Sequence, residues 1–371
     1  MNESRILLVI FIILTLLTGC WDQKTLKHSK FMSIIGFDII DDQKYFVTTA
    51  INLFKEMGEA KEQMSEIVMG EGYTVKDGFL SLDQMISDEP LPMKLNSILV
   101  SEDVARKDVY QVLDTFFRTP ESPLGAKIIV VEGKASDVIQ VKKVGETNIG
   151  DHLRDLMISA EDDSLIPKQT ALFTFSSLFD PGKSIVLPFI KLAQGKIELG
   201  GLALFHQKQM NGKLSSKETQ IFMLLADKID QNMIFTEKIN LQDQHHEGVY
   251  ITIEVKDMNR KLSVKAKDPN DIKVMIDVQL EAEIIEFPSD QLESNKLIEK
   301  INQVLTEKLT KNAEKVVNTL LDANCDAFGV GRELIAYHTE IWDQLDWEKA
   351  YPSIKIQPKI KVDIRKTGII K

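Results

Sequence analysis

Between Ile272 and Ile284 the sequence reads IKVMIDVQLEAEI, and every even-numbered position carries an apolar residue. Side chains on a β-strand alternate between two faces, so this pattern predicts a strand with one face buried and one face in water. Such one-sided burial is typical of antiparallel sheets. The stretch therefore predicts the sheet around which the second half of the chain folds.

The same alternation recurs on both sides of this stretch. Apolar residues alternate over 249–255 and again over 262–266. Near the C-terminus, residues 354–364 alternate around Pro358, which lacks an N–H group and so suits an edge position or a bulge. These runs predict the remaining strands of the sheet.

A long helix is predicted directly after the 272–284 strand. It begins at Pro288-Ser289-Asp290 and ends near Asn324. Its apolar residues follow a period of 3.6 and are Leu297, Ile298, Ile301, Val304, Leu305, Leu309, Ala313, Val316, Val317 and Leu320. At about 1.5 Å per residue the helix would run about 50 Å, enough to lie across the whole sheet.

The first half of the chain mixes short strands with helices. The predicted strands are 34–40, 45–53, 97–100 and 126–131, and the predicted helices are 74–87 and 101–118. Residues 55–69 show no clean period and are predicted to form a loop. The fold class is therefore α+β, with an N-terminal domain over 31–195 and a C-terminal domain over 196–371.

The amino-acid composition excludes several classes of partner and site. The chain has 371 residues, 45 basic against 56 acidic, and a net charge of −11. Nucleic acid and anionic membrane surfaces are both bound through clustered Lys and Arg, so neither is an expected partner of this acidic surface. Two cysteines exclude a disulfide-rich scaffold and a four-cysteine zinc site.

The N-terminus has the pattern of a lipoprotein signal peptide over residues 1–19. Arg5 precedes an apolar run from Ile6 to Leu17, and Leu17-Thr18-Gly19-Cys20 follows. Twelve helical residues reach only about 18 Å, short of the hydrocarbon core of about 30 Å, so the run fits a cleaved signal better than a permanent span. The motif is similar to a bacterial lipobox, in which the Cys thiol takes a diacylglyceryl group before cleavage.

Cys20 is therefore the predicted lipid attachment site, followed by a lipidated tether over 20–30. The alternative is an uncleaved anchor with Cys20 near the headgroups. Two acyl chains anchor a protein without a basic patch. Cys325 is then the remaining thiol; it lies in an apolar helical pattern and is expected to be buried and unreactive.

Motifs of known catalytic and metal sites are incomplete. Pro181-Gly182-Lys183-Ser184 lacks the first glycine of a phosphate loop, and Gly329-Val330-Gly331 lacks the third glycine of a dinucleotide turn. His245-His246-Glu247 would point to opposite faces of a strand, and Glu161-Asp162-Asp163 lacks the spacing of a calcium loop. No enzymatic activity, cofactor or metal is expected, although a catalytic pair distant in sequence would form no such motif.

A set of short motifs in a fixed order resembles the Ger(x)C family, the lipoprotein C subunits of GerA-type nutrient germinant receptors. The motifs are Gly19-Cys20-Trp21-Asp22, Gly36-Phe37-Asp38, Gly72-Tyr73-Thr74-Val75, Ser101-Glu102-Asp103-Val104-Ala105-Arg106, Gly201-Leu202-Ala203-Leu204-Phe205, Gly212-Lys213-Leu214, Glu218-Thr219, Asp326-Ala327-Phe328-Gly329-Val330-Gly331 and Trp342. They span nearly the whole mature chain. The chain departs from the family at Lys94-Leu95-Asn96 and Thr339-Glu340-Ile341, which leaves open a paralogous role or another nutrient.

The resemblance implies a lipid-anchored α+β protein on the extracytoplasmic face of the inner membrane of bacterial spores. It implies two integral membrane partners, subunits A and B of the receptor, and nutrients that act on the assembled receptor. It implies no enzymatic activity and no defined ligand site. In simpler terms, Gly329 and Gly331 end a helix and allow a turn, and Phe328 and Trp342 are core residues.

Three functions are open on sequence grounds. The first is a spore germination lipoprotein needed for receptor assembly, which the lipobox and the α+β pattern favour. The alternative is a solute-binding lipoprotein of an importer, which would show repeated strand–helix alternation with parallel sheets. A lipid-anchored hydrolase would need a cleft with convergent titratable groups.

Overall fold

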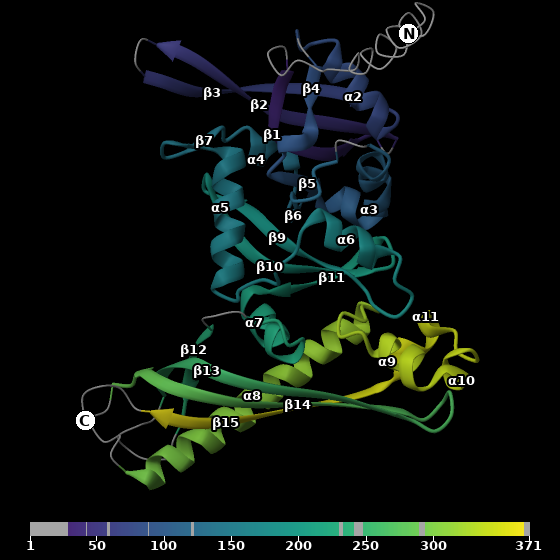
Figure 1. Cartoon of the computed structure of the whole chain (residues 1–371). Coiled ribbons are helices and arrows are strands. Elements are labelled where there is room, and N and C mark those ends of the chain that lie inside the picture. Colours follow the sequence, from purple (N-terminus) through teal and green to yellow (C-terminus); the bar gives the residue numbers. More distant parts are fainter. Residues whose placement is uncertain are drawn as a thin grey trace, which may run out of the picture.

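The computed structural model describes residues 29–41, 43–57, 60–87, 89–119, 122–229, 233–240, 248–288 and 294–366. The predicted signal peptide, Cys20 and all but the end of the predicted tether lie outside these residues, as does His245-His246-Glu247. Ser29 and Lys30, at the end of the predicted tether, already belong to the first strand. Figure 1 shows a larger sheet with its helices at one end of the molecule and a smaller, elongated sheet at the other.

The larger sheet contains nine strands in its described part. Its order is β11-β10-β9-β6-β5-β1-β2-β3, with β4 paired to β1. The strands are β1 (Ser29–Ile40), β2 (Lys44–Met57), β3 (Ala60–Gly72), β4 (Glu89–Leu91), β5 (Ser97–Ser101), β6 (Lys127–Val131), β9 (Val186–Ala193), β10 (Lys196–His206) and β11 (Gln209–Ser215). A separate small hairpin joins β7 (Lys143–Val144) and β8 (Thr147–Asn148). Because β1, β5, β6 and β9 pair in parallel while the outer pairs are antiparallel, the sheet is mixed.

Helices cover both faces of this sheet (Figure 1). They are α2 (Val75–Asp83), η2 (Pro92–Lys94), α3 (Glu102–Phe117), α4 (Ala135–Ile139), α5 (Ile149–Asp162), α6 (Ala171–Leu178) and α7 (Ser216–Leu225). Buried residues of α2, α3 and α6 share one core with alternate residues of β1 and β5, and those of α4, α5 and α7 share the other. Burial on both faces explains why all five residues of β5 are apolar or small. The predicted α+β class is confirmed.

The predicted domain boundary between 195 and 196 falls in the β9–β10 turn. Gln194 and Gly195 both have positive φ there, and β10 then pairs with β9 from Lys196 onward. The larger sheet therefore continues through β10 and β11, which lie after the predicted boundary. A division into two domains at this point would separate two hydrogen-bonded strands.

The loop predicted over residues 55–69 is wrong. β2 continues to Met57, and β3 begins at Ala60 and pairs antiparallel with it, with Val47 opposite Gly70. The backbone of β3 gains its hydrogen bonds from β2, and this pairing does not require alternating apolar residues along the strand.

The smaller sheet confirms the alternating stretch that begins at Ile272. Its order is β12 (Met233–Ile239), β13 (Val249–Ala266), β14 (Ile272–Glu286) and β15 (Lys355–Lys366). The runs over 249–255 and 262–266 are one strand, β13. β15 pairs in parallel with β14, so the sheet is not purely antiparallel. β15 lies at the edge of the sheet, as Pro358 predicted.

Helix α8 (Asn295–Asp322) crosses this sheet (Figure 1). It begins later than predicted, at Asn295, and residues 289–293 lie outside the described part. The buried residues of its stripe are Ile301, Leu305, Leu309, Ala313, Val316, Val317 and Leu320. Three short helices and a 3-10 turn then lead to β15, namely α9 (Val330–Tyr337), α10 (Thr339–Trp342), α11 (Trp347–Ala350) and η3 (Tyr351–Ser353).

Side chains of α8 close the free edge of β15. The backbone N–H groups of Ile360 and Val362 donate to the hydroxyls of Thr310 (3.1 Å) and Thr306 (3.0 Å). The N–H of Ile364 donates to Oδ1 of Asn302 at 3.1 Å. Residues spaced by four lie on one face of a helix, so these three α8 side chains form one row. They occupy the backbone N–H groups at an edge that another strand could otherwise join.

Thr306→Val and Thr310→Val should each destabilise the fold by about 1–3 kcal/mol, because each leaves an inward-facing backbone N–H without an acceptor. Thr319→Val is the matched control, since among the described residues the Thr319 hydroxyl bonds only within its own helix, to the Lys315 carbonyl. Urea unfolding of the three variants checks this. Equal stability of all three would show that water replaces the helix side chains at this edge.

Candidate functional site

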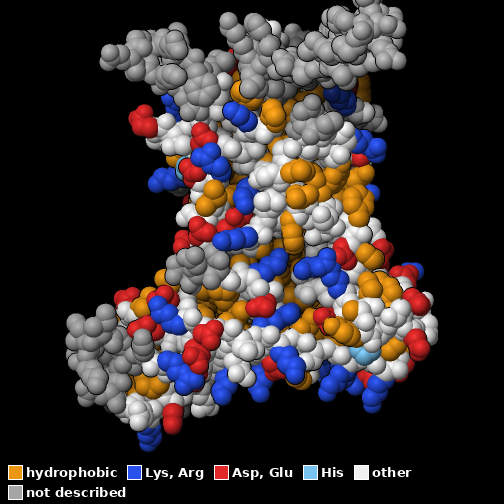
Figure 2. All heavy atoms as spheres, viewed as in Figure 1, with side chains coloured by type: hydrophobic (Ala, Val, Ile, Leu, Met, Phe, Trp, Pro, Cys, Tyr) orange, Lys and Arg blue, Asp and Glu red, His pale blue; other side chains and the backbone are white. Residues whose placement is uncertain are grey.

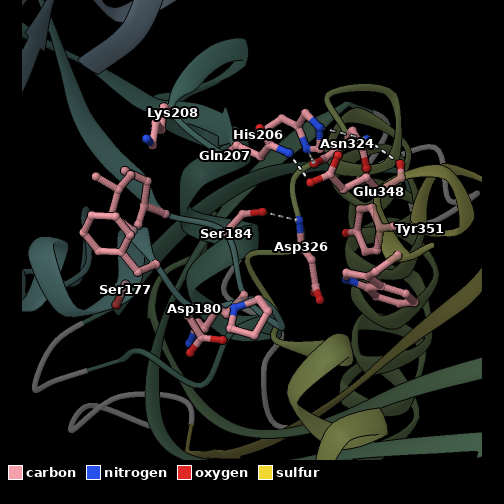
Figure 3. Close-up of a pocket in the computed structure, with 16 residues that line it drawn as sticks. Ser177, Asp180, Ser184, His206, Gln207, Lys208, Asn324, Asp326, Glu348 and Tyr351 are labelled. Atoms are coloured by element: carbon pink, nitrogen blue, oxygen red, sulfur yellow. Dashed lines mark hydrogen bonds between the residues drawn. The ribbon is translucent and has the colours of Figure 1, made fainter. Parts of the chain in front are cut away.

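A pocket of about 260 Å³ lies where the larger sheet meets the C-terminal helices. Three segments line it: the end of α6 with the loop to β9 (177–185), the β10–β11 turn (206–208), and the chain around Asn324, Asp326 and residues 347–351 (Figure 3). These segments are far apart in sequence, so the fold alone brings them together. We call this cavity the junction pocket.

Asp326 is the buried anchor of the junction pocket. Its carboxylate accepts hydrogen bonds from the backbone N–H groups of Gly329 (2.9 Å), Val330 (2.9 Å) and Gly331 (2.8 Å). Its own N–H donates to the Ser184 hydroxyl at 3.0 Å, which Figure 3 shows. Burial raises the pKa of the Asp326 carboxyl to about 6, although the three N–H donors and Trp347 lower it. The carboxylate thus closes a loop of its own chain.

Glycines pack face to face beside this loop. A Cβ on Gly331 would lie 2.8 Å from the Cα of Gly182 and 2.9 Å from Nε1 of Trp347. A Cβ on Gly182 would lie 2.6 Å from the N of Arg332. Gly329 has φ of 76°, which favours glycine. The two incomplete nucleotide-binding motifs, at Gly182 and at Gly331, therefore lie against each other in the fold. Their glycines allow the two chain segments to pack closely.

Cys325 lies just behind the pocket, after the end of α8. It is fully buried, and burial raises the pKa of its thiol to about 12. The Tyr351 hydroxyl donates to its carbonyl at 3.0 Å. The prediction of a buried structural thiol is confirmed, and such a thiol is unreactive at neutral pH.

The acidic and polar groups at the rim of the pocket already have partners. Asp180 accepts from the Gly182 N–H at 2.9 Å and forms an ion pair with Arg332. Gln207 donates to Glu348. Nδ1 of His206 is 3.0 Å from the Asn324 carbonyl, and these side chains are seen together in Figure 3.

The basic groups lack such partners. Lys183 and Lys208 line the pocket and form no ion pair with any residue in the described ranges. Lys183 also lies within electrostatic range of Lys228, Arg260 and Arg332, and its pKa is lowered first by burial and then by Arg332. Nη2 of Arg260 is buried and has no hydrogen-bond partner in the part of the chain that the structure describes. Asp326 and Asp180 offset part of this positive charge, because their carboxylates raise the pKa of Lys183.

Lys228→Met should stabilise the fold by about 1–3 kcal/mol at neutral pH, because methionine keeps the packing of the stem and removes a charge that burial disfavours. Burial lowers the pKa of Lys228 to about 8, with a further contribution from Lys183. The unfolded value is about 10.4, so between these pH values the unfolded chain binds more protons and the free energy of unfolding rises with pH.

Urea unfolding at pH 7, 8.5 and 10 measures this, with the exposed Lys217→Met as the control. The difference between Lys228→Met and the parent should shrink as the pH rises. A constant difference, or a variant less stable than the parent, would show that the ammonium group is favourably solvated or paired.

The other residues singled out from the sequence have structural roles. Glu161 accepts from Nζ of Lys127 at 2.6 Å and from the Gln169 N–H at 3.1 Å, so the acidic triplet is not assembled as a cation site. Phe328 stacks on Phe222 with ring centroids 5.7 Å apart. Within the described ranges no group of His, Cys, Asp and Glu could hold a metal ion, and no helix in them is long and apolar enough to cross a membrane.

Asp38, in the motif Gly36-Phe37-Asp38, resembles Asp326 in that its carboxylate binds backbone N–H groups. The Asp38 carboxylate accepts from the N–H groups of Ala135 (2.7 Å) and Ser136 (2.9 Å) and so joins β1 to the start of α4. A Cβ on Gly36 would lie 2.8 Å from Cδ1 of Ile139. The junction pocket has no local sequence signature, because its lining comes from segments whose contact depends on the packing of Gly182 against Gly331.

Comparison with known proteins matches both halves of the chain. The family model for the spore germination protein N-terminal domain matches residues 22–192, and the model for the spore germination B3/GerAC-like C-terminal domain matches residues 200–368. The chain is 24% identical to spore germination protein GerQC of Bacillus cereus, over 97% of this chain and 98% of that protein. It is 22% identical to spore germination protein B3 of Bacillus subtilis (strain 168), over 98% of this chain and 97% of that protein.

The fold is similar to that in the crystal structure of the GerBC protein. The TM-score is 0.55 at 18% sequence identity, and the match covers 89% of this chain and 96% of that chain. At this identity the likeness concerns the fold alone.

Proposed function

The chain belongs to the GerAC-like family of spore germination proteins, and on that premise we propose that it is the lipid-anchored C subunit of a nutrient germinant receptor. In this role it is attached through Cys20 to the extracytoplasmic face of the inner spore membrane. It is needed there for assembly and function of the receptor.

The observation that carries the proposal is the extent of the family match. Two domain models of one family match residues 22–192 and 200–368 in order, and the relatives share nearly their whole length with this chain. Relatives named spore germination protein A3, B3 and KC point to a set of related receptors. The membrane partners of this chain would be subunits A and B of one such receptor.

A role without catalysis is supported by how the reactive groups are used. The Asp326 and Asp38 carboxylates each hold backbone N–H groups of their own chain, and the Cys325 thiol is buried. Groups engaged in this way are not poised to transfer protons or attack a substrate. Lys183 and Lys208 line the junction pocket and form no ion pair within the described ranges.

The proposal is tested by affinity purification of the tagged, lipidated chain from spores. Two integral membrane proteins related to the A and B subunits of germinant receptors should be recovered with it. Recovery of an importer permease in their place would identify the chain as a solute-binding lipoprotein.

A further inference from the structure

The smaller sheet buries one of its faces against α8 and leaves the other face exposed. Buried residues of β14, among them Val274 and Ile276, share a core with Leu305 of α8. Burial alternates along β14, so its odd-numbered side chains point to the opposite face. Figure 2 shows Lys and Arg side chains along the lower edge of the molecule, where this sheet lies.

Three lysines lie side by side at one end of the exposed face. The strand register places Lys265 of β13 opposite Lys273 of β14, and Lys273 opposite Lys355 of β15. All three side chains are exposed. Like charges directly opposite one another destabilise a sheet, so this row lowers the stability of the fold.

A second group of lysines lies four residues further along the strands. Lys261 and Lys359 flank Asp277, and Lys361 lies opposite Gln279. The six lysines of the two groups form what we call the lysine face: Lys261, Lys265, Lys273, Lys355, Lys359 and Lys361.

The acids near the lysine face leave most of its charge unpaired. Asp271, in the turn between β13 and β14, pairs with Lys273 at 2.7 Å, and Asp277 lies within the face. The other five lysines form no ion pair with any residue in the described ranges. The charges added by the turn and by the cavity beside it are equal in number for each sign: Lys267, Asp268, Asp346 and Lys349. Six lysines thus stand against two acids.

The other end of the same sheet shows how exposed charges pair there. Arg365 forms ion pairs with Glu281 at 2.7 Å and Asp363 at 3.2 Å, and Lys256 forms one with Glu254 at 2.6 Å. The lysine face lacks this mixing, although the whole chain has a net charge of −11. A concentrated positive charge of this kind is complementary to an anionic partner.

The spacing of the lysines fits an acidic α-helix laid across the strands. Neighbouring strands are about 4.8 Å apart, and residues three or four apart on a helix are about 5–6 Å apart, so acids along one side of a helix match the row that contains Lys273. The two lysine groups are about 13 Å apart along the strands, and a helix is about 10–12 Å wide. Such a helix would have lysines on both flanks and Met275, which is 44% exposed, beneath it.

We propose that the lysine face binds an acidic helix of a partner protein, with Glu or Asp side chains on both flanks of the helix and an apolar side chain that contacts Met275. With Cys20 as the anchor, the bilayer lies near β1, in the larger sheet at the other end of the molecule (Figure 1). That position favours a protein partner over anionic lipid. The inference goes beyond the proposed function, because it names a surface and the chemistry of the partner that covers it.

The test measures binding of a labelled peptide to the purified full chain by fluorescence anisotropy. The probe is a helical peptide with Glu on two flanks, at i and i+4 spacing, and Leu between them. Lys355→Glu should weaken binding about tenfold and Lys359→Gln about threefold, since the first reverses a charge contact and the second removes one. Lys196→Glu, in the β9–β10 turn, is the matched control and should stay within about twofold of the parent.

Folding and salt dependence are checked on the same proteins. Lys355→Glu places a carboxylate opposite Lys273, so its urea midpoint should equal or exceed that of the parent. A merely structural role for Lys355 would lower the midpoint. Binding of the peptide by the parent should weaken as salt rises, because exposed charge pairs are screened.

A second measurement asks what covers this face in spores. A photo-crosslinking residue in place of Met275 should join the full chain to a second polypeptide, and Lys355→Glu in the same chain should reduce the product about tenfold. The same residue in place of Tyr337, which is 75% exposed on α9, should give no such product. The crosslinked segment should carry acids at i and i+4 spacing, and a segment without acids would contradict the proposal.

Four binding results would overturn the inference. A parent chain that does not bind the peptide would make the lysine face a solvated surface. Equal binding of a scrambled peptide of the same composition would show unspecific charge attraction, and equal weakening by Lys196→Glu would show an effect of net charge. Tighter binding to phosphatidylglycerol vesicles, lost in Lys355→Glu, would make the face a lipid-binding surface. No receptor subunit takes part in the peptide assay, so its failure would leave the proposed function standing.

Discussion

Replacing Cys20 with Ala should release the chain from the membrane and strongly impair germination in response to nutrients. Residues 1–19 contain one acid and one base, so the mature chain keeps the net charge of −11. That charge offers no electrostatic attraction to an anionic bilayer. Acyl chains contribute about 0.8 kcal/mol per buried CH₂, so their loss removes the source of membrane affinity.

Labelled fatty acid and membrane fractionation of sporulating cells measure this effect. Cys325→Ala is the matched control, because that thiol is buried and should take no label. The control should remain acylated and membrane-bound, and the Cys20→Ala chain should be neither. An unlabelled Cys20→Ala chain that stays on the membrane and supports full nutrient germination would refute a role for lipid at this residue.

Asp326→Asn should destabilise the fold by about 2–4 kcal/mol, the largest effect expected of a single polar substitution here. The carboxylate accepts from three backbone N–H groups, whereas an amide has one acceptor oxygen and adds an NH₂ that faces those donors. The loop between α8 and α9 would open, and Gly331 would no longer pack against Gly182. Spores carrying this variant should contain little of the chain.

Asp322→Asn is the control for this substitution, because Asp322 is exposed at the end of α8. Gly331→Ala tests the same loop in another way, since its Cβ would meet backbone 2.8 Å away. Urea unfolding should rank the two loop variants far below the control. If Asp326→Asn unfolds with the control, the loop is held by packing and not by the carboxylate.

The sequence predicts well those elements whose pattern is local and long. The alternation that starts at Ile272 and the stripe of α8 each extend over many residues, so both were recovered as a strand and a helix with one buried face. The hairpin of β2 and β3 was missed because its pairing, and not its own composition, holds β3 in place. The parallel direction of β15 depends on where α9 to α11 return the chain, which no local pattern reveals.

The site was harder to predict than the fold for a related reason. Gly182 and Gly331 are far apart in the sequence but pack against each other in the fold. In the sequence they stand out only as parts of two incomplete nucleotide-binding motifs. The exposed face of α6 also escaped, since Leu172, Phe173 and Phe179 have the composition of a buried helix. Two short motifs of the family resemblance have structural roles in this chain, because the Asp38 and Asp326 carboxylates each accept hydrogen bonds from backbone N–H groups.

We infer that this chain works as one subunit of a membrane receptor. The most direct measurement is quantitative mass spectrometry of proteins recovered with the tagged, lipidated chain from spores, against an untagged parent and the Cys20→Ala chain. A receptor subunit should recover two integral membrane proteins, related to germinant receptor subunits A and B, in amounts comparable to the chain and absent from the untagged control. Recovery of the chain alone, or with a transport permease, would contradict it.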